Sequence, residues 1–508
     1  MMSYFIKKNK EYIFLLVIFL IISLAIILKS YFNFNGYISP DSGYYLALAK
    51  HLLNGEGFVI SAYEYGGTKN AFFATWPVGY PVLIMLVSKF TGLSIFWSSK
   101  VLNIVLLGFL FLFLKLLFKK KAYIYSFVFL FSSYLEILSF TWSENLFLLS
   151  MICFSYFLNN VIFLKKNLYI QSTFLLLSTL LLFLSRYIGA FSICVLILVL
   201  IYLIFFKKEP RKIYAISFTC FFNLIFVIGY LYNNLLQTGF IQGSKYNAPN
   251  PNELHFDFFI SLIKALTAEF LIPVHTIHSL ESKYLSIIFL LLQIFAIFYI
   301  YFNHKDKIKK FIKKQKIPSI GLIFMSVGLF YICILIFLKF VLQNIDSFGY
   351  RLLAPGTLLI IFAVISYILQ SNSPSIKKKF LICFLPFIFI SLLLNFPVKI
   401  FFHNLKNPLT YQNYQNNILN EYINAKKDSI VIFSERRHIR YLRNDLERLN
   451  PNKNENWENF INRIDPEKTK NIYLKTPTIT DLKDIKIYDQ SIFNKIVEYP
   501  PNKLIKIR

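Results

Sequence analysis

Residues 11–30 read EYIFLLVIFLIISLAIILKS, an apolar run that carries charge only near its two ends. A helix needs about 20 such residues to cross the hydrocarbon core of a bilayer. Three lysines precede the run (Lys7, Lys8 and Lys10). The run is longer than the apolar part of a secretory signal, and no small-residue cleavage site follows it. We therefore expect an uncleaved membrane anchor.

The composition extends this interpretation to the whole chain. Of its 508 residues, 56% are hydrophobic, 19% aromatic and only 16% charged, and the mean hydropathy is +0.54. Average soluble proteins carry about a quarter charged residues. The 57 phenylalanines and 33 tyrosines are too many for a soluble core of this size. The sequence is that of a polytopic α-helical membrane protein.

Eleven runs are long and apolar enough to span a membrane. They cover residues 11–30, 94–118, 122–140, 143–164, 167–185, 187–206, 212–236, 283–303, 318–341, 352–370 and 379–396. All five cysteines lie inside such runs: Cys153, Cys194, Cys220, Cys333 and Cys383. None stands in a CxxC pair or near a histidine at ligand spacing, so we expect neither a disulfide framework nor a structural zinc site.

The basic residues predict the orientation of these spans. A net charge of +28 in a soluble protein would suggest nucleic acid, but membrane proteins concentrate Lys and Arg in cytoplasmic loops. With the N-terminus inside, the inner helix ends hold 22 Lys and Arg residues, at 1–10, 119–121, 165–166, 207–212, 304–316 and 371–379. The opposite connectors are longer and poor in basic residues. We expect a plasma (inner) membrane protein, no nucleic-acid partner, and a C-terminal segment outside the cytoplasm.

The first outer loop, residues 31–93, contains two predicted helices. Pro40–Leu53 has apolar residues at helical spacing, with Ser39 as the N-cap and Gly55 as a stop. Gly79–Thr91 follows the break at Trp76-Pro77. Amphipathic helices of this kind lie along membrane surfaces.

The polar segment 397–508 differs from the rest, with 20 Lys and Arg against 13 Asp and Glu. Strands are expected at 429–434 and 471–475, a helix at 435–449, and a further strand pair at 496–498 and 504–507. We therefore predict two domains: a transmembrane catalytic domain over residues 1–396 and an extracytoplasmic α/β domain over 397–508.

Ionisable residues beside membrane spans are costly and are candidates for function. Most of them collect at the predicted outer helix ends: Asp41, Glu136, Glu144, Arg186, His275, His278, Lys339, Asp346 and Arg351. A transporter would place polar groups near the bilayer midplane instead. Charges at one interface suit a reaction between a lipid-borne substrate and a partner outside the membrane.

Several motifs at these positions resemble one family. Residues 40–49 read PDSGYYLALA, followed by Leu52-Leu53-Asn54-Gly55, and residues 76–81 read WPVGYP. Residues 143–147 read SENLF, and Arg186-Tyr187 and residues 351–355 (RLLAP) complete the set. Together they are similar to motifs of GT-C glycosyltransferases, most of all to the branch of protein O-mannosyltransferases and lipid A aminoarabinose transferases. The resemblance covers residues 10–370 and is confined to motifs.

The resemblance implies transfer of a monosaccharide from a polyprenyl-phosphate donor to a lipid, glycan or protein acceptor outside the membrane, with inversion. An acceptor hydroxyl needs a base, for which Asp41 is the candidate; its alternative role is to cap a helix. Arg186 and Arg351 would bind the donor phosphate, or else anchor the chain to lipid headgroups. Glu144 would orient the acceptor, hold a basic partner or ligate a metal; otherwise it caps its helix.

Aromatic residues of the first loop are further candidates for substrate contact: Tyr44, Tyr45, Trp76 and Tyr80. They are equally compatible with an ordinary interfacial aromatic belt. Relatives carry an acidic pair where this chain has Asp41-Ser42, which weakens the case for a metal. His275 and His278 are spaced to face one ligand but have no carboxylate at a fixed distance. No cofactor or metal is therefore expected, and the two histidines remain candidates for substrate binding.

Two other functions stay open. A ligase that moves an oligosaccharide from a polyprenyl diphosphate would make His275 and His278 central. A flippase or transporter of lipid-linked sugars would bind donors without forming product.

Overall fold

The computed structural model describes most of the chain. In the membrane part it covers residues 2–60, 71–163, 167–242, 319–342, 350–370 and 374–406, with isolated positions between 288 and 305. In the C-terminal part it covers 408–427, 429–432, 438–443, 445–449, 456–465, 471–476, 490–500 and 503–507. The chain forms two compact units: Met1–Ser30 with Lys100–Leu231 and Lys245–Pro408, and Tyr31–Ser99 with Tyr232–Ser244 and Leu409–Arg508.

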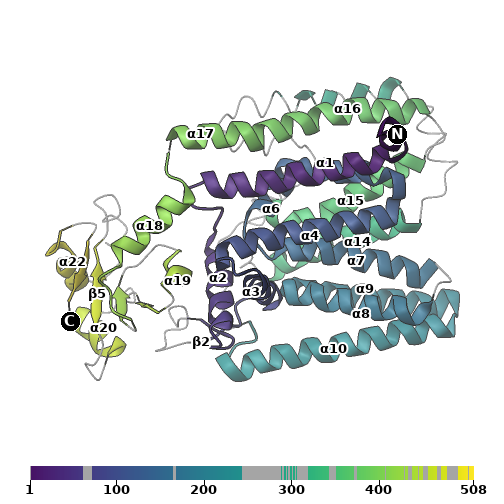
Figure 1. The fold of residues 1–508 in the computed structure, drawn as a ribbon. Coiled ribbons are helices and arrows are strands. Elements are labelled where there is room, and N and C mark those ends of the chain that lie inside the picture. The colour runs from purple at the N-terminus through teal and green to yellow at the C-terminus, as the bar shows by residue number, and fades with distance from the viewer. Residues whose placement is uncertain are drawn as a thin grey trace. The chain divides into compact units, whose positions relative to one another are not determined.

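Long apolar helices build the first unit and run side by side (Figure 1). They are α1 (Met2–Phe32), α4 (Ile95–Phe118), α7 (Glu144–Phe163), α8 (Leu168–Ser185), α9 (Phe191–Tyr202), α10 (Pro210–Thr238), α14 (Ser319–Leu342), α15 (Tyr350–Gln370) and α16 (Pro374–Leu393). Within the described residues, nine helical runs are long and apolar enough to cross a membrane. The chain is an integral, multi-pass membrane protein.

The predicted span 122–140 is not one continuous helix. It divides into α5 (Ala122–Ser126), the 3-10 turn η3 (Phe127–Leu130) and α6 (Ser132–Ser139), and Phe131 between them has an extended backbone. The predicted span 283–303 falls mainly outside the described residues. The last helix continues beyond the expected boundary at 396, through a π-helical turn (Leu394–Val398) into α17 (Lys399–Lys406). The division at 396 stays a prediction.

Two glycines let α14 and α15 approach closely. A Cβ atom at Gly328 would lie 2.7 Å from the carbonyl oxygen of Gly356, and one at Gly356 would lie 2.8 Å from a side-chain carbon of Ile332. Small residues serve this purpose between membrane helices, where packing rather than water drives association. The approach holds α15, and with it Arg351, against α14.

In the second unit, the loop helices form where the sequence predicts them. These are α2 (Pro40–Leu53) and α3 (Gly79–Thr91), with a two-stranded pair of β1 (Val59–Ile60) and β2 (Ala71–Phe72) between them. Ser39 caps α2 as expected: it accepts from the Ser42 backbone N–H at 3.2 Å, and the Ser42 hydroxyl accepts from Ser39 N–H at 3.0 Å. Every α2 residue from Ser42 to Ala49 is buried. Protein therefore covers α2 more completely than a helix with one apolar face would require.

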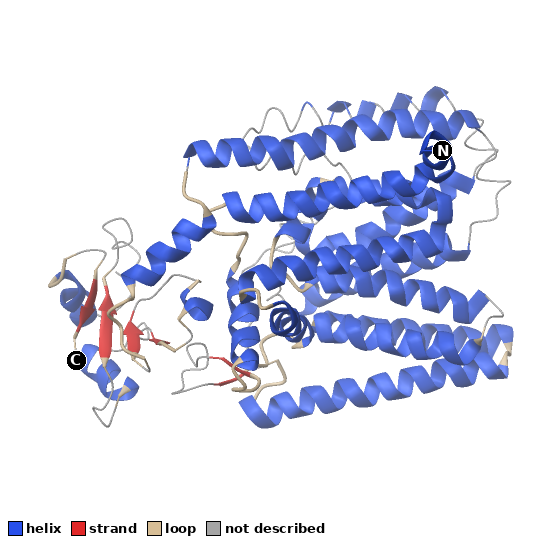
Figure 2. Cartoon of the chain, in the orientation of Figure 1, coloured by secondary structure: helices blue, strands red, loops and turns tan. Residues whose placement is uncertain are grey.

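The C-terminal part contains a four-stranded mixed sheet in the order β4-β3-β5-β6 (Figure 2). The strands are β3 (Ile430–Ile432), β4 (Glu447–Leu449), β5 (Ile472–Lys475) and β6 (Leu504–Lys506). β3 is parallel to β4 and β5, and β5 is antiparallel to β6. The helices are α18 (Tyr411–Glu421), α19 (Ile439–Leu442), α20 (Trp457–Ile464) and α22 (Gln490–Val497).

Two predictions in this part are wrong. The helix expected over 435–449 does not extend to its predicted end: residues 439–442 form α19, but residues 447–449 pair with β3 as strand β4. Residues 496–497 end α22 instead of forming a strand, because Ile492 and Ile496, four residues apart, are both buried in the core beside the sheet. The strands expected near 429–434, 471–475 and 504–507 are confirmed.

Candidate active site

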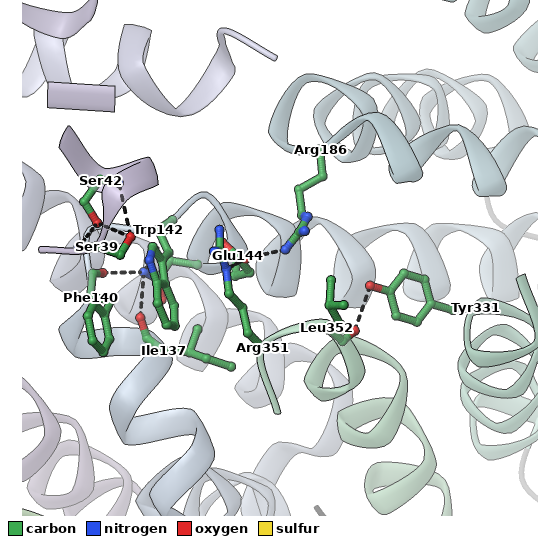
Figure 3. A network of polar contacts seen from close by, with 11 residues as sticks. Ser39, Ser42, Ile137, Phe140, Trp142, Glu144, Arg186, Tyr331, Arg351 and Leu352 are labelled. Atoms are coloured by element: carbon green, nitrogen blue, oxygen red, sulfur yellow. Dashed lines mark hydrogen bonds and ion pairs between the residues drawn. The ribbon is translucent and has the colours of Figure 1, made fainter. Parts of the chain in front are cut away.

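Glu144 is the first residue of α7, and its side chain is fully buried. One carboxylate oxygen, Oε1, accepts hydrogen bonds from both Arg186 Nη1 and Arg351 Nε (Figure 3). The three residues come from the start of α7, the end of α8 and the start of α15. The structure thus brings together three residues that lie 42 to 207 positions apart in the sequence. Glu144 thus holds two basic partners, which was one of the roles predicted for it.

The backbone at the end of α8 positions Arg186, and an aromatic ring positions Arg351. Arg186 follows α8 in extended conformation, with its N–H bonded to the carbonyl of Leu182 at 3.1 Å. The next turn packs tightly on α8, since a Cβ atom at Gly189 would lie 2.1 Å from that same carbonyl oxygen. The Arg351 guanidinium carbon lies 4.5 Å from the ring centroid of Trp142. Stacking on an aromatic face holds a planar guanidinium in one orientation.

The cluster Glu144–Arg186–Arg351 carries one surplus positive charge, because two guanidinium groups face one carboxylate. The second Glu144 oxygen, Oε2, is buried and has no hydrogen-bond partner among the described residues. The side chains of Arg186 and Arg351 keep 16% and 21% of their surface exposed. A guanidinium has five N–H groups, and these two donate one each to Glu144. The arrangement suits the binding of an anion, and of a phosphate in particular.

Three amide and ammonium groups hold the turn that leads into α7. Lys100, 1% exposed, donates to the carbonyl of Ser139 at 2.7 Å, and Asn103 donates to those of Leu138 and Phe140. Asn145 donates to the carbonyls of Ile137, Phe140 and Trp142. Helix ends leave their last carbonyls without partners inside the helix. These donors satisfy them and so fix the position of Glu144.

A second buried cluster lies on α6. Glu136 Oε1 accepts from Lys29 Nζ at 2.8 Å and from Lys399 Nζ at 2.6 Å. The Lys29 side chain is fully buried, whereas Lys399 keeps 26% of its surface exposed. The contact ties α1, α6 and α17 together. Lys29, Lys100 and Lys399 escaped the sequence analysis, although a lysine inside an apolar run is the signal that marks the first two.

In the second unit, Asp41 lies in the first turn of α2 and is partly exposed. The capping box is made by Ser39 and Ser42, so the predicted alternative for Asp41 as the cap is not needed. Tyr44 follows three residues later and therefore lies on the same face of the helix. Its ring stacks on Trp76 with centroids 5.8 Å apart.

The other predicted aromatic residues gather around the same helix. Tyr45 packs edge to face against both Trp76 and Tyr80, at 6.3 and 5.6 Å between centroids. Both tyrosines are fully buried. Lys50, one further turn along α2, donates to the carbonyls of Tyr441 and Leu442. Burial, assisted by nearby Arg443, lowers the pKa of Lys50.

The predicted histidines His275 and His278 lie outside the described residues. Within the part of the chain that the structure describes, no group of three or more His, Cys, Asp or Glu side chains is placed to hold a metal ion.

Comparison with solved structures identifies the architecture. The archaeal oligosaccharyltransferase AglB from Archaeoglobus fulgidus, in complex with an inhibitory peptide and a dolichol-phosphate, matches with a TM-score of 0.51 at 10% identity. The match covers 99% of this chain and 74% of that one. The apo form of the same oligosaccharyltransferase matches with a TM-score of 0.50 at 11% identity, over 92% of this chain and 69% of that one. The chain has the GT-C fold.

A third solved structure is also similar to this chain. ArnT from Cupriavidus metallidurans bound to undecaprenyl phosphate is 11% identical, with a TM-score of 0.49, and the match covers 93% of this chain and 95% of that one. No family model and no curated protein matches the sequence. The GT-C fold was predicted from short motifs, and the two matches to the oligosaccharyltransferase confirm it.

Proposed function

We propose that this GT-C chain is a membrane glycosyltransferase that moves one monosaccharide from a polyprenyl-phosphate donor to an acceptor on the outer side of the membrane, with inversion. The acceptor is a lipid, a glycan or a protein. The observation that carries the proposal is the buried cluster Glu144–Arg186–Arg351 with its surplus positive charge. AglB, which shares the fold, is described with a bound dolichol-phosphate.

The cluster matches the change of charge during such a reaction. A sugar linked to polyprenyl phosphate is a phosphodiester with one negative charge. When the bond between the anomeric carbon and the phosphate oxygen breaks, the phosphate gains a second. Arg186 and Arg351 therefore stabilise the transition state more than the bound donor, which is the requirement for catalysis. Glu144 holds both guanidinium groups in position.

Asp41 is the proposed general base. Its carboxylate takes the proton of the acceptor hydroxyl while that oxygen forms a bond to the anomeric carbon. The bond to the phosphate breaks on the opposite face, and the polyprenyl phosphate leaves, so the configuration inverts. Of the four predicted aromatic residues, Trp76 is partly exposed and supplies aromatic surface for the sugar, whereas Tyr44, Tyr45 and Tyr80 are buried and support it from behind.

Oligosaccharide transfer from a polyprenyl diphosphate is the second candidate. It is favoured by one observation: the fold matches with TM-scores of 0.50 and 0.51 are to an oligosaccharyltransferase. In that case His275 and His278 would contact the diphosphate.

A transfer assay with purified protein in proteoliposomes tests both candidate functions and distinguishes between them. The protein is offered radiolabelled sugars on polyprenyl phosphate or on polyprenyl diphosphate, with cell-envelope extract as the source of acceptor. The proposal expects labelled product from the monophosphate donor. Product from the diphosphate donor alone would favour the ligase. Binding of the monophosphate donor with no product from either would contradict enzymatic transfer and leave the transporter.

A further inference from the structure

Arg440 of α19 contacts α2, the helix that contains the motif at residues 40–49. Its guanidinium carbon lies 3.7 Å from the centroid of the Tyr44 ring, within the distance for a strong cation–π contact. The Tyr44 ring also stacks on Trp76, so it contacts an indole and a guanidinium. The arginine comes from the C-terminal part of the chain, almost 400 residues after Tyr44, and both lie in the same compact unit.

The place of Arg440 is fixed by its neighbours on α19. Lys50 of α2 donates to the carbonyls of Tyr441 at 2.9 Å and Leu442 at 3.2 Å. His438 Nε2 lies 3.3 Å from the carbonyl oxygen of Asn35, and the His438 side chain is buried. The contact of Arg440 with Tyr44 is thus held in place by the surrounding hydrogen bonds. It is not the chance contact of a long side chain that lies loosely on the surface.

The Tyr44 hydroxyl points to a ligand. Tyr44 is 6% exposed, and its hydroxyl oxygen has no hydrogen-bond partner among the described residues. A buried polar group without a partner costs about 1–3 kcal/mol, and native structures contain few of them. A leucine or phenylalanine at this position would avoid the cost. A bound substrate that hydrogen-bonds to the hydroxyl would offset it.

We propose that Arg440 and the Tyr44 hydroxyl bind an anionic group, a phosphate or a carboxylate, on the acceptor. A guanidinium that is stacked by its face carries five N–H groups in its plane, more than one partner takes up, and can therefore donate to an oxyanion as well. Asp41 lies one helical turn before Tyr44, so this anion would lie beside the hydroxyl that Asp41 deprotonates. Residues 436–443 (RRHIRYLR) contain four arginines, a local excess of positive charge that favours an anionic partner. The inference rests on the proposed function and assigns a substrate class to it.

The first test measures transfer kinetics with the full-length protein in proteoliposomes. For Arg440→Ala we expect the acceptor KM to rise about 10- to 100-fold, with the donor KM and the rate at saturating acceptor unchanged. Tyr44→Phe keeps the ring under the guanidinium and removes only the hydroxyl, and we expect its acceptor KM to rise about 5-fold. Arg463→Ala is the matched control, because Arg463 also lies over an aromatic ring, Phe460, in the C-terminal part. It should change neither KM.

The second test needs no transfer. Phenylglyoxal modifies accessible arginines, and peptide mass spectrometry follows Arg440 and Arg463 separately. Inorganic phosphate or acetate in the millimolar range should protect Arg440 and leave Arg463 unprotected, and the more effective anion indicates whether the acceptor carries a phosphate or a carboxylate. Tyr44→Phe should weaken the protection.

The outcomes separate this inference from the proposed function. If the wild type transfers sugar and Arg440→Ala leaves the acceptor KM unchanged, or raises the donor KM instead, the inference is overturned and the function stands. If no transfer occurs but Arg440 is protected by an anion, the anion site stands and the glycosyltransferase proposal fails. Equal modification of Arg440 with and without either anion overturns the site.

Discussion

At the residue scale, the molecule contains two buried carboxylates with the same local pattern. Glu144 and Glu136 each accept from two cationic side chains at Oε1. They differ in their partners, since Glu144 holds two partly exposed arginines, whereas Glu136 holds two lysines, of which Lys29 is fully buried. Lysine is a compact point charge, and arginine carries a fork that fits phosphate. We therefore propose that the first cluster binds substrate and that the second anchors helices.

This assignment predicts that two matched substitutions affect stability alike and activity differently. Glu144→Gln and Glu136→Gln should both destabilise the protein, by about 2–4 kcal/mol, because each leaves buried cations without their counter-charge. Single-turnover transfer per folded molecule should fall more than about 100-fold for Glu144→Gln, since its arginines lose their position. For Glu136→Gln it should stay within about 3-fold of wild type. Equal losses of activity would contradict the division between the clusters.

The residues of the Glu144 cluster could be predicted one by one, because each is a charge at the end of an apolar run. That both arginines donate to a single carboxylate oxygen could not be predicted, since packing determines the relative positions of the helices that carry these residues. Arg440 escaped the sequence analysis altogether. It stands in a polar segment where an arginine is unremarkable by composition, and only the contact with Tyr44 distinguishes it.

At the scale of elements, local signals predicted the helices that begin with a cap or end at a break. Ser39 with Pro40 marked the start of α2, and the break at Trp76-Pro77 marked the start of α3. The same signals failed where tertiary pairing decides, as at residues 447–449, which form the edge strand β4 by pairing with β3. They also missed the break at Phe131, although two polar residues, Ser132 and Ser133, follow it directly.

The contact between α14 and α15 gives a prediction for the membrane part. Gly328→Ala should destabilise the protein by about 1–3 kcal/mol, because its Cβ would meet the Gly356 carbonyl oxygen at 2.7 Å and force the helices apart. Gly229→Ala is the control: it lies within α10 with nothing within 4 Å of its Cβ, and alanine is the better helix former. It should be neutral or stabilising. Thermal unfolding in one detergent compares the two variants, and equal midpoints would contradict the close approach.

At the scale of the whole molecule, the charge distribution predicts how the chain lies in the membrane. The predicted inner helix ends hold 22 Lys and Arg residues, so the C-terminal segment should lie outside the cytoplasm. Alkaline phosphatase fused after residue 508 should be active, and the same enzyme fused after residue 208 should be inactive. Green fluorescent protein should fluoresce when fused after residue 208 and should not fluoresce when fused after residue 508. An inactive phosphatase at the C-terminus would contradict the predicted topology and the outward-facing site.

In the proposed reaction the chain transfers a sugar from a polyprenyl phosphate with Asp41 as the base. Single-turnover transfer in proteoliposomes tests it most directly, with purified wild type and Asp41→Asn at equal amounts of folded protein. The asparagine keeps the size of the side chain but cannot take the acceptor proton, so product formation should fall by at least about 100-fold while donor binding is retained. Wild-type rates in the Asp41→Asn variant would contradict the assignment of the base.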